Sequence, residues 1–103
     1  MQPFLVAFML LMYYYYIKKM AKIKKLIDRF KTKPKDFTWN ELTKFLNGFG
    51  YKQVNSGKTS GSRVRFVHMH YHPIILHKPH PIQILKRYQL EEISNLLVRE
   101  KLL

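Results

Sequence analysis

The segment 57–66 constrains the fold of this chain most strongly, because a turn rich in glycine and serine leads directly into an alternating run of basic and apolar residues. Val64 and Phe66 alternate in it with Arg63 and Arg65. Side chains of a β-strand point alternately to its two faces, so the apolar pair shares one face and the arginines share the other. The pattern predicts a strand with one core-facing side and one basic side. A solvated edge strand is the alternative, because basic residues also protect exposed edges against aggregation.

The overall charge of the chain is far from neutral. Its 19 Lys and Arg residues stand against 6 Asp and Glu residues, which gives a net charge of +13 over 103 residues. Such an excess predicts attraction to a polyanion, and the candidates are a nucleic acid, an acidic protein and an anionic membrane. The length allows one small domain with a single core. The absence of cysteine excludes disulfides and thiolate metal sites.

Residues 1–19 differ from the rest of the chain. Pro3 to Ile17 is almost entirely apolar and aromatic, and two lysines follow it. Read as a transmembrane helix, this segment is shorter than the roughly 20 apolar residues that a bilayer requires. Read as a signal peptide, it lacks a basic start and a small-residue cleavage site. We favour a third interpretation, in which translation starts at Met20, residues 1–19 are an upstream extension, and residues 20–103 form the domain.

The remaining chain alternates between helical and strand patterns. Apolar residues recur at helical spacing over 20–30, until Pro34 interrupts the pattern. Thr38, with Glu41 three residues later, forms a capping box, which signals the start of a helix. The predicted elements are the helices Met20–Phe30, Trp39–Asn47 and Leu85–Leu97 and the strands Tyr51–Val54, Ser62–His68 and Ile74–His77.

These elements predict an α+β fold. A three-stranded antiparallel sheet has one face covered by two main helices, and an N-terminal helical extension precedes it. The other sheet face, which carries Arg63 and Arg65, is expected to stay open. Trp39 and Tyr88 have apolar neighbours at helical spacing, so we assign both to the core. Their alternative role is to stack on nucleic-acid bases.

Residues 20–103 resemble the HicA toxins. The resemblance rests on a composite pattern: Asp36-Phe37-Thr38-Trp39 through Gly50-Tyr51, then Gly61-Ser62, then His80-Pro81 ahead of Leu85-Lys86. It implies a fold like a double-stranded-RNA-binding domain, ribosome-independent cleavage of messenger RNA as an mRNA interferase, and neutralisation by a HicB-type antitoxin. It also favours a start at Met20. We then expect a cytoplasmic protein that needs no cofactor and has no stable membrane association.

One position departs from the family pattern. A histidine usually follows the Gly-Ser pair and carries the ribonuclease activity, and here Arg63 stands in its place. A guanidinium stays protonated, so it can clamp a phosphate or stabilise its charge but cannot act as a base. We therefore take His80, His68 and Arg63 as the catalytic candidates, because His80 and His68 match other family histidines. The alternative is a catalytically impaired module that binds RNA or antitoxin only.

Several basic residues can converge on RNA at the turn, the second strand and the approach to the last helix. Each of them alone is also consistent with a solvated surface charge. The five histidines lie within thirteen residues, and His68-x-His70-x-His72 suggests a metal site, although no Cys or carboxylate completes a ligand set, so we assign none. The predicted RNA-binding residues are Lys58, Ser62, Arg63, Arg65, Lys78, Lys86 and Arg87.

Overall fold

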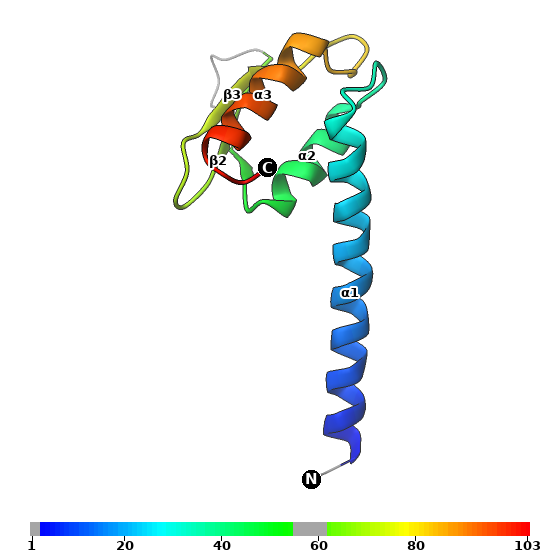
Figure 1. The fold of residues 1–103 in the computed structure, drawn as a ribbon. Helices are drawn as coiled ribbons and strands as arrows, with labels where there is room; N and C mark the ends of the chain where they lie inside the picture. Colours follow the sequence, from blue (N-terminus) through cyan, green and yellow to red (C-terminus); the bar gives the residue numbers. More distant parts are fainter. Residues whose placement is uncertain (1–2, 55–61) are drawn as a thin grey trace.

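Three helices and three strands make up the chain in the computed structural model, which describes residues 3–54 and 62–103 (Figure 1). The strands form one antiparallel sheet in the order β1-β2-β3. This confirms the predicted α+β fold with an open three-stranded sheet. The elements in chain order are α1 (Pro3–Lys31), α2 (Trp39–Gly48), β1 (Lys52–Val54), β2 (Arg63–Val67), β3 (Ile74–His77) and α3 (Arg87–Arg99).

Helix α2 begins with the predicted capping box. The Thr38 hydroxyl accepts a hydrogen bond from the Glu41 backbone N–H at 3.1 Å, and the Glu41 carboxylate accepts one from the Thr38 N–H, also at 3.1 Å. The helix ends at Gly48, and the Phe49 ring folds back against Phe45 at 5.1 Å. Gly50 then adopts a φ of +96°, a conformation that favours glycine. This turn directs the chain into β1.

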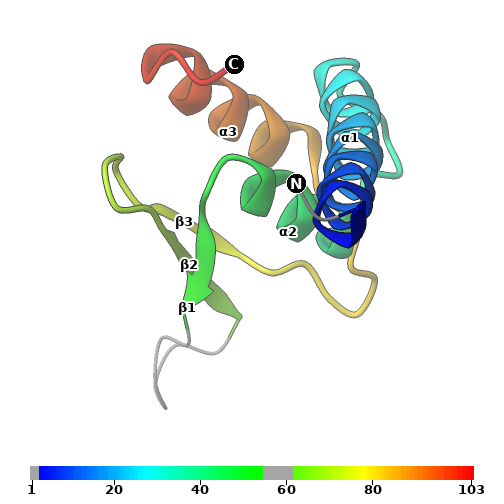
Figure 2. The same ribbon diagram turned by 90° about the horizontal axis from the view of Figure 1, so that it is seen from below.

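The strand register separates a covered sheet face from an open one. Residues 63 to 66 of β2 pair with 77 to 74 of β3, so Arg63 lies opposite His77 and Arg65 lies opposite Ile75. Phe66 is buried, whereas both arginines and His77 are exposed. The predicted alternation along 62–68 is therefore confirmed. Figure 2 shows the sheet to one side of the helices, with its other side uncovered.

The core lies between the sheet and the helices. Phe30 of α1 stacks on Phe45 of α2 with 4.1 Å between ring centroids, and Trp39 lies 5.7 Å from Phe66. Trp39 is buried as predicted. The core residues are Phe30, Phe37, Trp39, Leu42, Phe45, Leu46, Tyr51, Phe66, Ile74, Leu76, Leu85, Leu90, Ile93 and Leu97.

The prediction that Tyr88 belongs to the core is wrong, because its side chain is 55% exposed. Helix α3 begins at Arg87, two residues later than predicted, and buries the face formed by Gln89, Leu90, Ile93 and Leu97. Tyr88 lies on the opposite side of the helix, in line with the exposed 91 and 92 positions.

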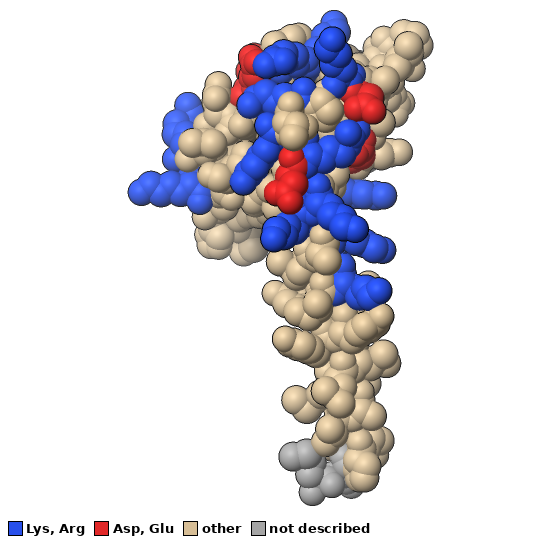
Figure 3. All heavy atoms as spheres, turned by 45° about the vertical axis from the view of Figure 1, so that its right-hand side comes forward, with Lys and Arg blue, Asp and Glu red and all other residues tan. Residues whose placement is uncertain are grey.

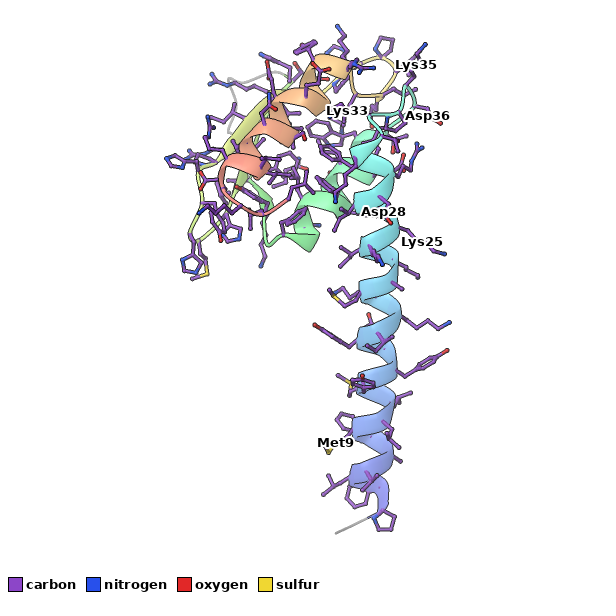
Figure 4. The ribbon with its side chains drawn as sticks, viewed as in Figure 1. Met9, Lys25, Asp28, Lys33, Lys35 and Asp36 are labelled. Carbon is purple, nitrogen blue, oxygen red and sulfur yellow. The ribbon has the colours of Figure 1, made fainter. Side chains whose placement is uncertain are left out.

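Helix α1 is continuous through Met20, where the sequence predicted a helix to start. The residues around position 20 are good helix formers, and no proline or glycine interrupts them. The C-terminal part of α1 contacts the domain: Leu26, Ile27 and Phe30 pack against the core, Ile23 lies against Gly48 of α2, and Arg29 pairs with Asp36 and Glu41. The preceding part extends away from the domain, as the position of Met9 shows in Figure 4. By length and composition, α1 is long and apolar enough to cross a membrane.

Candidate functional site

The start of β2 meets the end of β3 at one edge of the sheet. The Lys78 N–H donates a hydrogen bond to the Ser62 carbonyl at 2.7 Å, and the Ser62 hydroxyl lies 3.3 Å from His77 Nδ1. Arg63 is the cross-strand partner of His77. Directly opposite residues in an antiparallel pair have Cβ atoms about 5 Å apart on the same face. Arg63 and His77 therefore share the open face at this edge, and the Ser62 hydroxyl contacts the His77 ring there.

Two shallow hollows adjoin this edge and share Lys78 and His80. The larger, of about 350 Å³, is also lined by Ser62, Val64 and Gln83. The smaller, of about 190 Å³, lies against the residues that enter α3, including Lys86. Lys78 Nζ lies 5.7 Å from the centre of the Trp39 ring, so a cation–π contact with this core residue positions the ammonium group. We call Ser62, Arg63, His77, Lys78 and His80 the strand-end cluster.

Gln89 fixes the start of α3 against the strand-end cluster. Its amide donates a hydrogen bond to the His77 carbonyl at 2.9 Å, and its side-chain oxygen accepts one from the Lys86 N–H at 3.0 Å. Gln89 is buried, so this link is protected from water. Arg87, next to Lys86, forms a 3.0 Å ion pair with Glu91 one turn along the helix. The predicted basic residues of α3 thus lie beside the cluster, with the charge of Arg87 partly compensated.

His68 lies at the other end of β2. It is five residues from Arg63, which corresponds to about 16 Å along a strand. Its Nδ1 accepts a hydrogen bond from the His70 N–H at 3.0 Å, so Nε2 carries the proton and donates to the Phe49 carbonyl at 2.9 Å. Both ring nitrogens therefore bind backbone groups. The predicted catalytic role of His68 stays a prediction, and these contacts favour a structural one.

The other predicted residues are distributed as follows. Arg65 lies at the centre of the open face, opposite Ile75, and Lys58 falls outside the described residues. His72 pairs with Glu100 at 2.9 Å, at the end of the domain where α3 finishes. Within residues 3–54 and 62–103, no group of three or more histidines, cysteines and carboxylates is arranged to hold a metal ion.

Four of the six acidic residues are paired with a basic side chain. Glu41 and Asp36 both pair with Arg29, at 2.7 and 3.0 Å. The hydrogen bond from Arg29 is the main reason that the pKa of Glu41 lies below its ordinary value. Glu91 and Glu100 are also paired, with Arg87 and His72 respectively. The many other Lys and Arg residues carry the positive excess and predominate on the surface of the domain (Figure 3). The domain surface is thus suited to a polyanionic partner.

His77 and Gln89 were not predicted as site residues. His77 was only one of five clustered histidines, and its position beside Arg63 depends on the register between β2 and β3. Gln89 reads as an ordinary polar helix residue. Because side chains alternate along a strand, His77 shares a face with Ile75, opposite to buried Ile74 and Leu76, and this much could be predicted. Its pairing with Arg63 could not, because the register depends on how the 68–73 connection turns.

Comparison with known proteins identifies the family. Residues 39–98 match the family model described as HicA toxin of bacterial toxin-antitoxin. The match runs from the first residue of α2 to the penultimate residue of α3, so it contains the whole sheet and the strand-end cluster. Searches of curated proteins and of solved structures give no match. Because the family model covers more than half of the chain, this protein belongs to the HicA toxin family of bacterial toxin–antitoxin systems.

Proposed function

We propose that this protein is an endoribonuclease that cleaves messenger RNA independently of the ribosome. The observation that supports this most is the juxtaposition of Arg63, His77 and Ser62 at one sheet edge, with Lys78 beside them. Arg63 occupies the position of the usual family histidine, and His77 supplies an imidazole on the neighbouring strand. The same sheet edge therefore carries both a guanidinium and an imidazole.

The proposed chemistry is an internal transfer at the scissile phosphate. An imidazole takes the proton of a ribose 2′-hydroxyl, the 2′-oxygen bonds to phosphorus, and the bond to the 5′-oxygen breaks. The leaving oxygen receives a proton from a second imidazole or from water. Arg63 and Lys78 stabilise the negative charge that develops on the phosphate oxygens. This gives a 2′,3′-cyclic phosphate and a free 5′-hydroxyl, with no oxidant or cofactor required.

His77 and His80 are the two imidazoles available to this step. We take the tautomer in which His77 Nδ1–H donates to the Ser62 hydroxyl oxygen, which leaves the lone pair on Nε2; among residues 3–54 and 62–103 this Nε2 forms no hydrogen bond, so it can accept the proton. His80, a catalytic candidate from the sequence, lines both hollows of the strand-end cluster. We assign the base to His77 and protonation of the leaving group to His80. His68 lies too far along β2 to share a phosphate with Arg63.

The proposed protein partner is a HicB-type antitoxin with an acidic surface, and the proposed location of the domain is the cytoplasm. The open sheet face offers such a partner Arg63 and Arg65 next to Val54 and Ile75, which are 42% and 47% exposed. Such a face suits a protein partner that covers the apolar side chains and pairs its own acidic groups with the arginines. Its occupation would close the strand-end cluster to RNA.

A second function is favoured by one observation, the arginine at the usual histidine position. In this alternative the protein binds RNA or antitoxin without cleaving RNA. Arg63→Ala then still weakens RNA binding, by roughly fivefold to a hundredfold, because a guanidinium contributes about 1 to 3 kcal/mol to a phosphate contact. Cleavage of a defined RNA by the unaltered protein separates the two functions.

The decisive experiment compares three single histidine variants. The full chain and its His77→Ala, His80→Ala and His70→Ala variants are induced in cells while growth is followed, and the purified proteins are incubated with a defined RNA. We expect His77→Ala to lower the cleavage rate by about 100-fold or more, as loss of a general base does. His70→Ala is the matched control, because His70 is exposed in the 68–73 connection.

Three results would count against the assignment. Equal activity of all four proteins would mean that neither His77 nor His80 transfers the proton. Loss of activity only in His80→Ala would leave His80 as the base. An unaltered protein that binds RNA but neither cleaves it nor slows growth would establish the binding function instead.

A further inference from the structure

The N-terminal part of α1 presents an apolar surface that the domain does not cover. We call Phe4–Ile17 the stem. Its large apolar and aromatic side chains are between 38% exposed, at Val6, and 68% exposed, at Met9, and the segment contains no charged residue. An uncovered apolar surface of this extent is unfavourable in water. The stem therefore requires a partner.

The distribution of apolar residues around the stem selects the kind of partner. Successive residues of a helix are turned by about 100°, so the unbroken run from Phe4 to Met12 places apolar side chains on every side. A second protein helix covers one stripe of such a surface, as in a coiled coil with polar residues outside the seam. Hydrocarbon covers all sides at once. This favours a lipid bilayer over another copy of the chain.

The C-terminal end of the stem has the composition of a membrane interface. Tyr13–Tyr16 form a tyrosine cluster, and tyrosine prefers the boundary between hydrocarbon and headgroups. Lys18 follows and places its Nζ 5.3 Å from the Tyr14 ring centre. Within eight residues α1 carries five lysines, at positions 18, 19, 22, 24 and 25. Such a cluster suits the phosphate groups of anionic lipids.

A groove between α1 and α2 continues this basic surface onto the domain. It has a volume of about 580 Å³, and Lys19, Lys22, Lys25 and Lys44 line it together with apolar Ile23 and Leu26. Lys25 lies on α1 at the level where the helix reaches the domain (Figure 4). Ammonium groups beside apolar side chains fit a phospholipid headgroup and the upper part of its acyl chains.

From these observations we propose that the 103-residue protein is attached to the cytoplasmic face of a membrane containing anionic lipid, with the stem in the hydrocarbon. Pro3–Ile17 measures about 22 Å at 1.5 Å per residue, against about 30 Å for a full hydrocarbon core. The stem is thus too short to cross the whole hydrocarbon core. Because it is apolar on every side, it inserts along its axis, and its tyrosines and the following lysines lie at the membrane surface from which it enters. Lysines next to an inserted helix mark its cytoplasmic side, which leaves the domain where messenger RNA is found. This proposal does not depend on catalysis.

The test is flotation of the full chain with lipid vesicles. Protein purified in detergent is mixed with phosphatidylcholine vesicles, with or without phosphatidylglycerol, and centrifuged through a density gradient after the detergent is removed. We expect the unaltered protein to float with the anionic vesicles and to stay there in concentrated salt. Phe8→Lys with Leu11→Lys places two charges in the stem and is expected to reduce flotation about 100-fold or more.

Two further variants distinguish the contributions to membrane binding. One tests whether a charge must lie in the stem to prevent binding, and the other tests whether the lysines recognise the charge of the lipid. Met69→Lys adds one lysine, against two in the stem variant, at a 92% exposed apolar residue between β2 and β3, and this variant should float like the unaltered protein. Lys22→Gln with Lys25→Gln should lower the preference for phosphatidylglycerol by roughly 10-fold. Because Phe8 and Leu11 contact no core residue of the domain, circular dichroism should show all variants folded.

The proposal is overturned if the unaltered protein stays at the bottom of the gradient, or if the doubly substituted stem floats as well as the parent. Soluble oligomers that do not float would assign the stem to a protein contact instead. Equal flotation with neutral and anionic vesicles would remove the headgroup part of the proposal.

Discussion

Replacement of His68 by alanine decides whether this histidine stabilises the fold or transfers a proton. The substitution removes the hydrogen bonds to the Phe49 carbonyl and from the His70 N–H. Each contributes about 1 kcal/mol net. It also removes ring contacts with Tyr51 and Tyr71, at 5.0 and 4.6 Å, which add about 0.5 to 1.5 kcal/mol together. The expected loss in free energy of unfolding is therefore about 2.5 to 3.5 kcal/mol.

Urea unfolding followed by circular dichroism measures this loss. With a typical slope of about 1 to 3 kcal/mol per molar urea, the midpoint should fall by roughly 1 M or more. His70→Ala is the control, since its side chain is exposed and its backbone N–H remains; its free energy of unfolding should change by less than about 0.5 kcal/mol. RNA cleavage by the folded fraction of His68→Ala should match that of the parent. An unchanged urea midpoint combined with abolished cleavage would refute the structural role and restore His68 as a catalytic residue.

Two further predictions concern the junction of α1 with the domain. The pKa of Glu41 is lowered in the folded protein chiefly by its hydrogen bond from Arg29, so the stabilisation is present above the unfolded pKa and is lost as the pH falls through the folded pKa. Glu41→Gln should therefore lower the free energy of unfolding by about 1 kcal/mol near neutrality, and in urea titrations at several pH values the difference should shrink below the ordinary pKa of Glu and vanish only below the lowered folded pKa; a constant difference would contradict it. Phe30→Ala should lower the free energy of unfolding by about 3 to 5 kcal/mol, whereas Phe8→Ala on the stem should leave it unchanged, and a similar effect of both would show that the stem packs on the domain.

Local sequence signals predicted the elements of the domain well. The capping box of Thr38 and Glu41 located the start of α2, and the alternation of Val64 and Phe66 with the arginines assigned the two faces of β2. Both features are encoded within a few neighbouring residues, where periodicity and hydrogen-bonding chemistry leave few alternatives.

Features that depend on distant contacts were harder to predict. Tyr88 is apolar enough for a core position, but the helix rotation that exposes it is set by the packing of Leu90, Ile93 and Leu97 against the rest of the domain. The pairing of His77 with Arg63 is likewise a property of the sheet register. The sequence therefore drew attention to Ser62, Arg63, Lys78 and His80 but not to His77, whose place beside Arg63 only the register shows.

The unbroken course of α1 has a mechanical consequence. The helix is anchored in the core at Phe30 and continues straight into the stem without a joint (Figure 1). In the membrane-attached state proposed above, the domain can spin about the axis of α1 but cannot tumble independently of it. The sheet lies to one side of that axis (Figure 2). Rotation about this axis would then leave the distance between the strand-end cluster and the lipid surface unchanged. RNA would meet the cluster only at that distance from the membrane, within a thin layer of the cytoplasm.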